Sequence, residues 1–288
     1  MNPINSYLTF VNKLKEEEVK LIAKLYAETE KQILTSINSG LLNAKDLVFF
    51  KGKLTEAQKI LSYLDSGASQ WSQAMVKDMY GAGVKFAGLT ANISVSAADL
   101  QNKFNLQAMK VISDNIYNRF QDISALVGRR IDDIYRTTAL EAIKSNISGL
   151  DSLSKVAGNL RKGLADQGIT GFTDKAGKAW NMQTYSEMVA RTTTMETFRQ
   201  GTGNEYLQNN IDLVQITGGS ANSCDVCSKW EDQIVSLSGT DENYPSLDSA
   251  IAEGLFHPNC VHSYHVVIPD LTTLTKENNR LQKIYENS

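Results

Sequence analysis

The 288-residue chain has few cysteines, histidines and prolines: three, three and four, respectively. Three cysteines are too few for a disulfide framework, and an odd, low count is typical of a protein in a reducing compartment. No uncharged apolar run approaches the roughly 20 residues of a membrane span, and mean hydropathy is -0.28, which excludes an integral membrane protein. The first 20 residues lack a basic stretch followed by an apolar core, so we expect no secretory signal.

The rare residues are unevenly distributed along the chain. All cysteines and histidines lie between Cys224 and His265, and residues 4–244 contain no proline. Residues 1–204 hold 25 basic and 20 acidic residues, whereas residues 205–288 hold 4 and 12. With 42% hydrophobic residues, the chain is expected to build a sizeable core. The sequence predicts a mainly α protein with a small α+β C-terminal module.

We predict three regions. They are a helical region over residues 1–150, a module over residues 151–270 that contains the cysteines and histidines, and a polar tail over residues 271–288.

The proline-free part predicts long helices. Apolar residues at three- and four-residue steps indicate a helix over 7–38, which Gly40 should end. Further helices are expected over 44–64, ending at Ser66-Gly67, and over 69–80, broken at Gly81-Ala82-Gly83. The small residues from 81 to 98 predict a joint.

A longer helix is expected over residues 96–147. Its apolar residues follow an eleven-residue repeat, which keeps one stripe on a nearly straight helix of roughly 75 Å. We favour a core helix of a bundle over an exposed rod that packs on a partner. The stripe consists of Ile112, Ile116, Phe120, Ile123, Val127, Ile131 and Ile134.

Shorter elements are expected after Gly149. The predicted elements are a helix over 151–165, a β-hairpin over 169–180, a helix over 184–200, strands over 213–217, 233–237 and 264–267, and a helix over 273–285.

Cysteine and histidine form a candidate metal site. Cys224 and Cys227 make a C-x2-C pair, and His257, Cys260 and His262 follow about 30 residues later. Structural zinc takes four nitrogen or sulfur ligands, typically as two close pairs. Five residues compete for four places, so the second pair is either His257 with Cys260 or Cys260 with His262. The alternative is a set of reduced thiols and polar loop residues that bind no metal. It is disfavoured because all cysteines and histidines of the chain lie in one segment. His265, on a predicted strand, is the weakest ligand candidate.

We expect the metal to be structural. Catalytic zinc keeps an open position beside a general base, as in H-E-x-x-H, and here only Glu231 and Asp232 lie nearby. The acidic balance disfavours a DNA-reading finger. An HNH-type nuclease is also disfavoured, because a paired-histidine and acidic arrangement is missing.

A run of motifs in fixed order resembles the phage minor capsid proteins and, more broadly, the Mu F-like head morphogenesis proteins. The resemblance covers about residues 165–268. The first 150 residues resemble the family only in that long helices precede the module. It is carried by Trp180, Tyr185-x-x-Met188-x-x-Arg191-Thr192, Asn210–Ile216, Ser223–Gly239, Tyr244–Asp248 and Gly254–His262.

The resemblance implies a structural minor head protein, not an enzyme. Its implied partners are the portal protein and capsid or scaffold proteins, with weak contact to packaged DNA and a contribution to DNA packaging or ejection. Its implied location is the virion, in the head interior or at the portal vertex, after assembly in the host cytoplasm.

The resemblance also bears on single residues. It marks Cys224, Cys227, His257, Cys260 and His262 as the metal cluster, in which many relatives have cysteine at the position of His262. Relatives often carry arginine where this chain has Val261. For Trp180, Tyr185 and Arg191 we expect an aromatic core and a buried arginine that pairs with an acidic residue.

Two other functions remain as alternatives. A virion-carried enzyme, either an ADP-ribosyltransferase or a nuclease, is disfavoured because no catalytic signature is present. A nucleic-acid-binding ejection factor is disfavoured because the basic excess of residues 1–204 is small.

Overall fold

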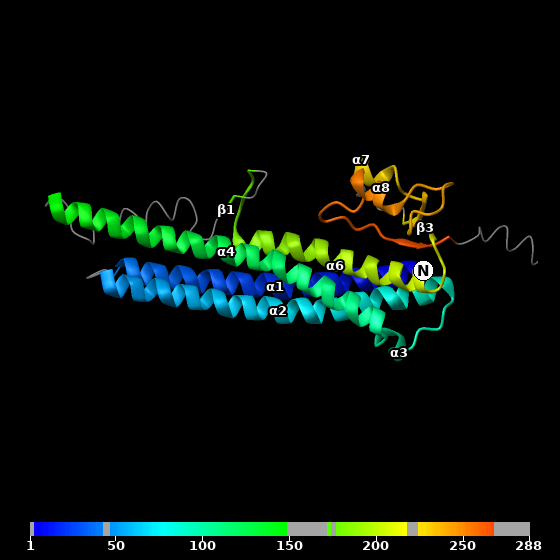
Figure 1. Ribbon diagram of the computed structural model, residues 1–288, viewed down its shortest axis with the longest axis horizontal. Helices are drawn as coiled ribbons and strands as arrows, with labels where there is room; N and C mark the ends of the chain where they lie inside the picture. Colours follow the sequence, from blue (N-terminus) through cyan, green and yellow to red (C-terminus); the bar gives the residue numbers. More distant parts are fainter. Residues whose placement is uncertain (1–2, 43–46, 149–171, 174–176, 218–223, 268–288) are drawn as a thin grey trace, which may run out of the picture.

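The computed structural model describes residues 3–42, 47–148, 172–173, 177–217 and 224–267. Most of these residues are helical, and a small antiparallel sheet lies at one end of the long helices (Figure 1). This confirms the predicted fold class. Within the described ranges, no helix combines the length and apolarity needed to cross a membrane. The predicted helices over 151–165 and 273–285 lie outside these ranges.

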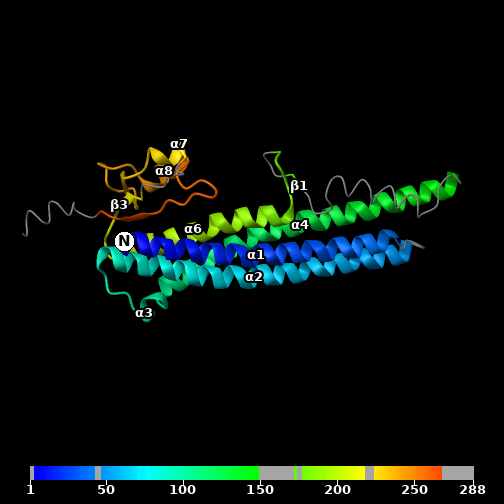
Figure 2. The ribbon, with the colours of Figure 1, turned by 180° about the vertical axis from the view of Figure 1, so that it is seen from behind.

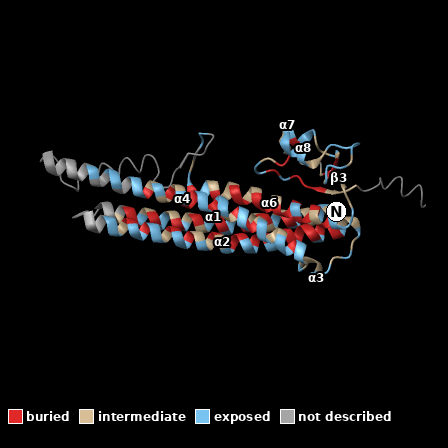
Figure 3. Ribbon diagram, viewed as in Figure 1, coloured by how far each residue is buried: buried red, intermediate tan, exposed pale blue. Residues whose placement is uncertain are grey.

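Four long helices pack side by side around one core. α1 and α4 start at the end of the bundle near the sheet, and α2 and α6 end there, so neighbours in sequence alternate in direction (Figures 1 and 2). Buried residues follow the inner faces of the helices (Figure 3). The bounds are α1 Pro3–Leu42, α2 Leu47–Ala91, α4 Lys103–Ser148 and α6 Met182–Gln208, with the one-turn α3 Ala97–Leu100 before α4.

The apolar stripe of the long predicted helix faces the bundle core, as expected for the bundle interpretation. Ile116, Phe120, Ile123, Val127 and Ile131 are buried, and Ile112 packs against them. The side chain of Ile134 lies outside the described set. The predicted helix over 96–147 is divided, because Ser96 caps α3 and Asn102 then caps α4 by accepting a hydrogen bond from Asn105 N at 2.8 Å.

The helix ends predicted at Ser66-Gly67 and Gly81-Ala82-Gly83 are wrong, because α2 runs through both. A Cβ atom at Gly83 would lie 2.1 Å from the carbonyl oxygen of Phe198, and one at Gly201 would lie 2.3 Å from that of Tyr80. The glycines therefore allow the backbones of α2 and α6 to touch, and this packing offsets their helix cost of about 1 kcal/mol each.

The other helix boundaries differ more modestly from the predictions. Gly40 does not end α1, which continues to Leu42, and α6 extends beyond the predicted 184–200 at both ends. The joint is also shorter than expected, because α2 ends only at Ala91 and α3 begins at Ala97.

The small sheet confirms the three predicted strands. The central strand pairs antiparallel with both neighbours, in the order β4-β3-β5. A separate two-residue ladder joins β1 and β2, at the place of the predicted hairpin. The bounds are β1 Phe172–Thr173, β2 Ala179–Trp180, β3 Leu213–Ile216, β4 Ile234–Ser236 and β5 Tyr264–Val266, with short helices α7 Asp225–Ser228 and α8 Leu247–Ala252 between strands.

α6 connects the helical bundle to the sheet. Its first part packs into the bundle core, and Tyr206 near its end belongs to the core of the sheet, together with Ala87 of α2. The Tyr206 hydroxyl accepts a hydrogen bond from Val266 N at 3.0 Å and bonds the Thr90 hydroxyl. The Tyr264 hydroxyl donates to the carbonyl oxygen of Arg199. The edge strand β5 is therefore fixed directly to the helices.

Candidate metal centre

The two halves of the cysteine–histidine cluster come from different elements. Cys224 caps α7, and its Sγ accepts a hydrogen bond from Cys227 N at 3.4 Å, so the C-x2-C pair occupies a single turn. The loop between α8 and β5 supplies the second half. That loop reverses through left-handed backbone at Gly254, Phe256 and Asn259, with φ of 102°, 60° and 67°.

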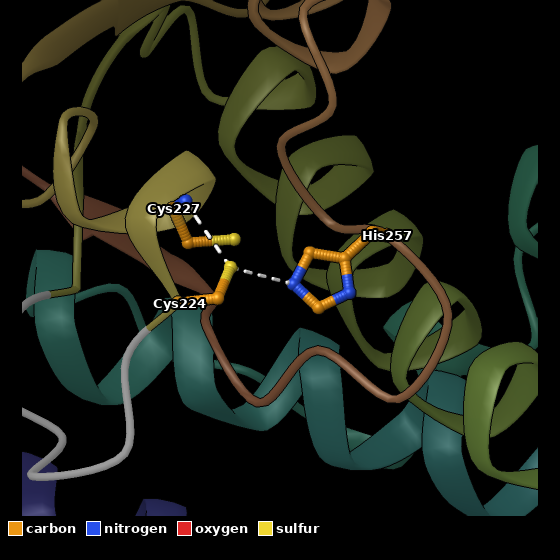
Figure 4. Close-up of side chains that lie close together, drawn as sticks. All are labelled: Cys224, Cys227 and His257. Atoms are coloured by element: carbon orange, nitrogen blue, oxygen red, sulfur yellow. Dashed lines mark hydrogen bonds between the residues drawn. The ribbon is translucent and has the colours of Figure 1, made fainter.

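The structure brings all five predicted ligands together in two overlapping triads that share Cys227. Cys224, Cys227 and His257 form the first triad (Figure 4), and Cys227, Cys260 and His262 form the second. Within each triad the ligand atoms lie within 4.8 Å of one another. Among the described residues, His265 joins neither triad, and its Nδ1 lies 2.8 Å from Val266 O.

The distances between ligand atoms approach those around a tetrahedral zinc ion. Such ligands lie about 3.3–3.8 Å apart, given bond lengths of about 2.0–2.3 Å. The Sγ atoms of Cys227 and Cys260 are 3.6 Å apart, and Cys260 Sγ lies 3.4 Å from His262 Nδ1. Cys224 Sγ and His257 Nε2 are closer, at 3.0 Å. The donor set fits zinc, and the spacing of Cys227, Cys260 and His262 falls within the tetrahedral range.

Both histidine rings are oriented by an oxygen atom on the side away from sulfur. His262 Nε2 lies 2.8 Å from Glu231 Oε1, and His257 Nδ1 lies 2.9 Å from the carbonyl oxygen of Pro258. Ligating histidines usually hydrogen-bond in this way, and a carboxylate partner raises the basicity of the ring. Glu231 therefore suits the role of a positioning residue.

The local environment lowers the pKa of two of the thiols and raises the pKa of the third. The hydrogen bond from Cys227 N lowers the pKa of Cys224 to about 7. Burial opposes ionisation of Cys260, but hydrogen bonds from His262 outweigh it and lower the pKa of that thiol to about 7. Burial and the neighbouring Cys260 raise the pKa of Cys227 to about 12. The hydrogen bond to Cys260 raises the pKa of His262 to about 9. Metal binding at these residues would therefore displace protons.

Arg199 of α6 is a component of the centre that the spacing of cysteine and histidine does not predict. It is buried, its Nη1 donates to the carbonyl oxygen of His262 at 2.9 Å, and its guanidinium lies 4.1 Å from the ring centre of Phe256. Burial lowers its pKa. The one available signal was an arginine directly after Phe198 in a helix with an apolar face. Arg199 fixes the loop of the second triad to the bundle.

We expect Arg199→Met to lower the free energy of unfolding by about 1–3 kcal/mol, because it leaves the buried carbonyl of His262 without its donor. Urea unfolding followed by tryptophan fluorescence measures the change. The matched control is Arg119→Met, which removes an exposed ion pair with Glu196 at 3.5 Å and should cost under about 1 kcal/mol. Equal effects of the two changes would contradict the role given to Arg199.

The remaining motif residues have structural contacts. Arg191 donates to Glu16 of α1 at 2.6 Å, which is the predicted ion pair, although Arg191 is half-buried. The rings of Trp180 and Tyr185 meet edge to face at 5.4 Å, and Lys178 lies 3.7 Å from the Trp180 ring centre. These contacts join α6 to α1 and to the β1–β2 ladder.

Comparison with known protein families gives a match over nearly the whole chain. The model of the family described as phage minor capsid protein 2 matches residues 11–288. The match includes the long helices as well as the motifs at 165–268 that carry the resemblance. No curated protein and no solved structure is found to match the chain.

Proposed function

We propose, since the chain belongs to the phage minor capsid protein 2 family, that this structural protein of the phage head acts in association with the portal. In this proposal it joins the portal and inner capsid or scaffold proteins during head assembly in the host cytoplasm. It then stays in the virion, in the head interior or at the portal vertex, where it aids DNA packaging or ejection.

The observation that supports this proposal is the family match across both the helices and the module. Long packed helices with exposed outer faces suit a scaffold that contacts several neighbours (Figure 3). We propose that residues 1–150 supply the portal and capsid contacts, that residues 151–270 form the module, and that residues 271–288 are a polar tail.

We also propose that the module binds one structural zinc ion through three cysteines and one histidine of the cluster. The ion would join α7 to the loop before β5, two segments that otherwise meet over a small core. Elemental analysis of purified protein should then show one zinc per chain, and a chelator should lower its melting temperature. Well under one zinc per chain, with melting unchanged by chelator, would contradict the zinc proposal.

Purified heads provide the test of the head-protein role. Mass spectrometry should detect the chain in DNA-filled particles, and a tagged chain should capture the portal protein from cells that assemble heads. A tagged Cys227→Ser chain, which is expected to lose the metal centre, tests whether capture of the portal protein depends on the module. Absence of the chain from particles, together with failure to capture the portal protein, would overturn the proposal.

A further inference from the structure

An apolar groove lies at the end of the bundle where α1 begins. It has a volume of about 360 Å³ and lies over α2, between α1 on one side and α3 and α4 on the other. Phe10, on its wall, is 52% exposed. The apolar lining is Tyr7, Phe10, Leu14, Ala82, Leu100 and Met109.

The floor and rim of the groove indicate what it can accept. Gly81 and Ala82 present almost no side chain, and the nearest atom to a Cβ at Gly81 would be Leu100 Cδ1 at 3.7 Å. The rim holds exposed Lys77 and Lys85, with Asp78 between them. A small apolar projection flanked by carboxylates would be complementary to this groove.

The module of the same chain has such a projection, which we call the α7–α8 face. Val226 and Ile251 are 40% and 45% exposed. They belong to neighbouring turns, because a Cβ at Gly254, just after α8, would lie 2.9 Å from Val226 Cγ1. Asp225, Asp248 and Glu253 are exposed beside them.

The α7–α8 face is acidic on balance. Lys229 is the one lysine or arginine between positions 205 and 267, and it forms an ion pair with Glu253 at 3.0 Å. The face therefore presents apolar side chains within a negative surround, which complements the lysines on the rim of the groove.

The two surfaces lie on different sides of one molecule. α7 and α8 lie on one side of the bundle, and α3, whose Leu100 lines the groove, lies on the opposite side at the same end (Figures 1 and 2). The two surfaces are therefore formed by different elements, so one molecule can offer each surface to a different neighbour. Contacts between different surfaces of identical subunits are heterologous, and they generate a ring when the rotation closes.

We propose that the chain self-associates head to tail, with the α7–α8 face of one copy seated in the apolar groove of the next. The interaction sets bundles side by side. It goes beyond the proposed function, because it requires only purified copies of this chain.

Two variants that each disable one surface test the proposal by sedimentation velocity over a range of concentrations. Phe10→Asp with Lys85→Glu disables the groove, and Asp248→Lys with Ile251→Lys disables the face. The wild-type chain should grow beyond a dimer with concentration, and each variant alone should stay monomeric. An equimolar mixture should stop at a heterodimer, because each variant retains the surface that its partner lacks.

Leu21→Asp is the matched control, since Leu21 is exposed on α1 outside the groove lining, and it should associate like the wild type. Circular dichroism verifies that each variant is folded. A wild-type chain that stays monomeric overturns the proposal, as does a mixture that forms no heterodimer. Neither result affects portal capture, so the two proposals fail separately.

Discussion

Replacing Cys227 with serine is expected to abolish metal binding and unfold residues 224–267, while the helical bundle, including α6, stays folded. Cys227 is fully buried and belongs to both triads, so no choice of fourth ligand avoids it. A serine oxygen reaches less far than sulfur and leaves a buried hydroxyl. Structural zinc contributes apparent binding free energies of about 10–16 kcal/mol, which is comparable with the whole stability of a domain, about 5–15 kcal/mol.

Three measurements test whether Cys227→Ser loses its zinc and its local fold. Elemental analysis should show the zinc content falling towards zero, and limited proteolysis should cut within residues 224–267. Circular dichroism should retain most of its helical signal, because α1, α2 and α4 carry most of the helix. Ser228→Ala is the control, at an exposed position in the same turn. A full zinc content in Cys227→Ser would contradict the assignment of this residue as a ligand.

Measurement of zinc binding also distinguishes the two histidines. His262 is buried and its ring is held by Glu231, whereas His257 is more exposed and is held by a backbone carbonyl. We therefore expect His262→Ala to lose more zinc affinity than His257→Ala. The opposite order would make His257 the fourth ligand.

Gly83→Ala is expected to destabilise the bundle by about 1–3 kcal/mol or more, the range for overpacked cores. The new methyl group would lie 2.1 Å from Phe198 O and 2.8 Å from Thr202 N. These are backbone atoms of α6, so the helices must move apart. Thermal unfolding followed by circular dichroism measures the change.

Gly128→Ala is the matched control, because its methyl group would meet only Leu61 Cδ1, at an ordinary 3.8 Å. Both glycines lie inside long helices, so alanine should gain about 1 kcal/mol of helix propensity at either position. We expect Gly128→Ala to be stabilising and Gly83→Ala destabilising. Stabilisation by both would show that α2 and α6 do not touch at Gly83.

The contrast between α4 and α2 shows what local sequence can predict. The stripe on α4 follows from helical periodicity, which depends on residues three and four apart. Whether the helix continues through Gly83 depends on Phe198 and Thr202, which are more than a hundred positions away. A glycine ends a helix only where nothing else compensates its cost, and the compensation here comes from a distant segment.

The metal centre, too, has features that local sequence predicts and features that it does not. The spacing of cysteine and histidine predicts which residues gather, because structural zinc sites typically take their ligands from two close pairs. It does not predict that Glu231 orients His262 or that Arg199 holds its carbonyl group. Those contacts depend on the reversal of the loop at Phe256 and Asn259, where non-glycine residues take positive φ, and on the docking of that loop against α6.

The attachment of β5 to α6 has a mechanical consequence. Tension applied to the chain just after β5 would first load the hydrogen bonds of β5 with β3 and the bond between Val266 and Tyr206. The ladder bonds run perpendicular to the strands, so they would resist together in shear. The force would then pass into a 27-residue helix that lies along the bundle, before it reached the loop that contains Cys260 and His262. A neighbour that pulls on the C-terminal end of the chain would therefore pull on the bundle, and the metal centre would be shielded from the strain.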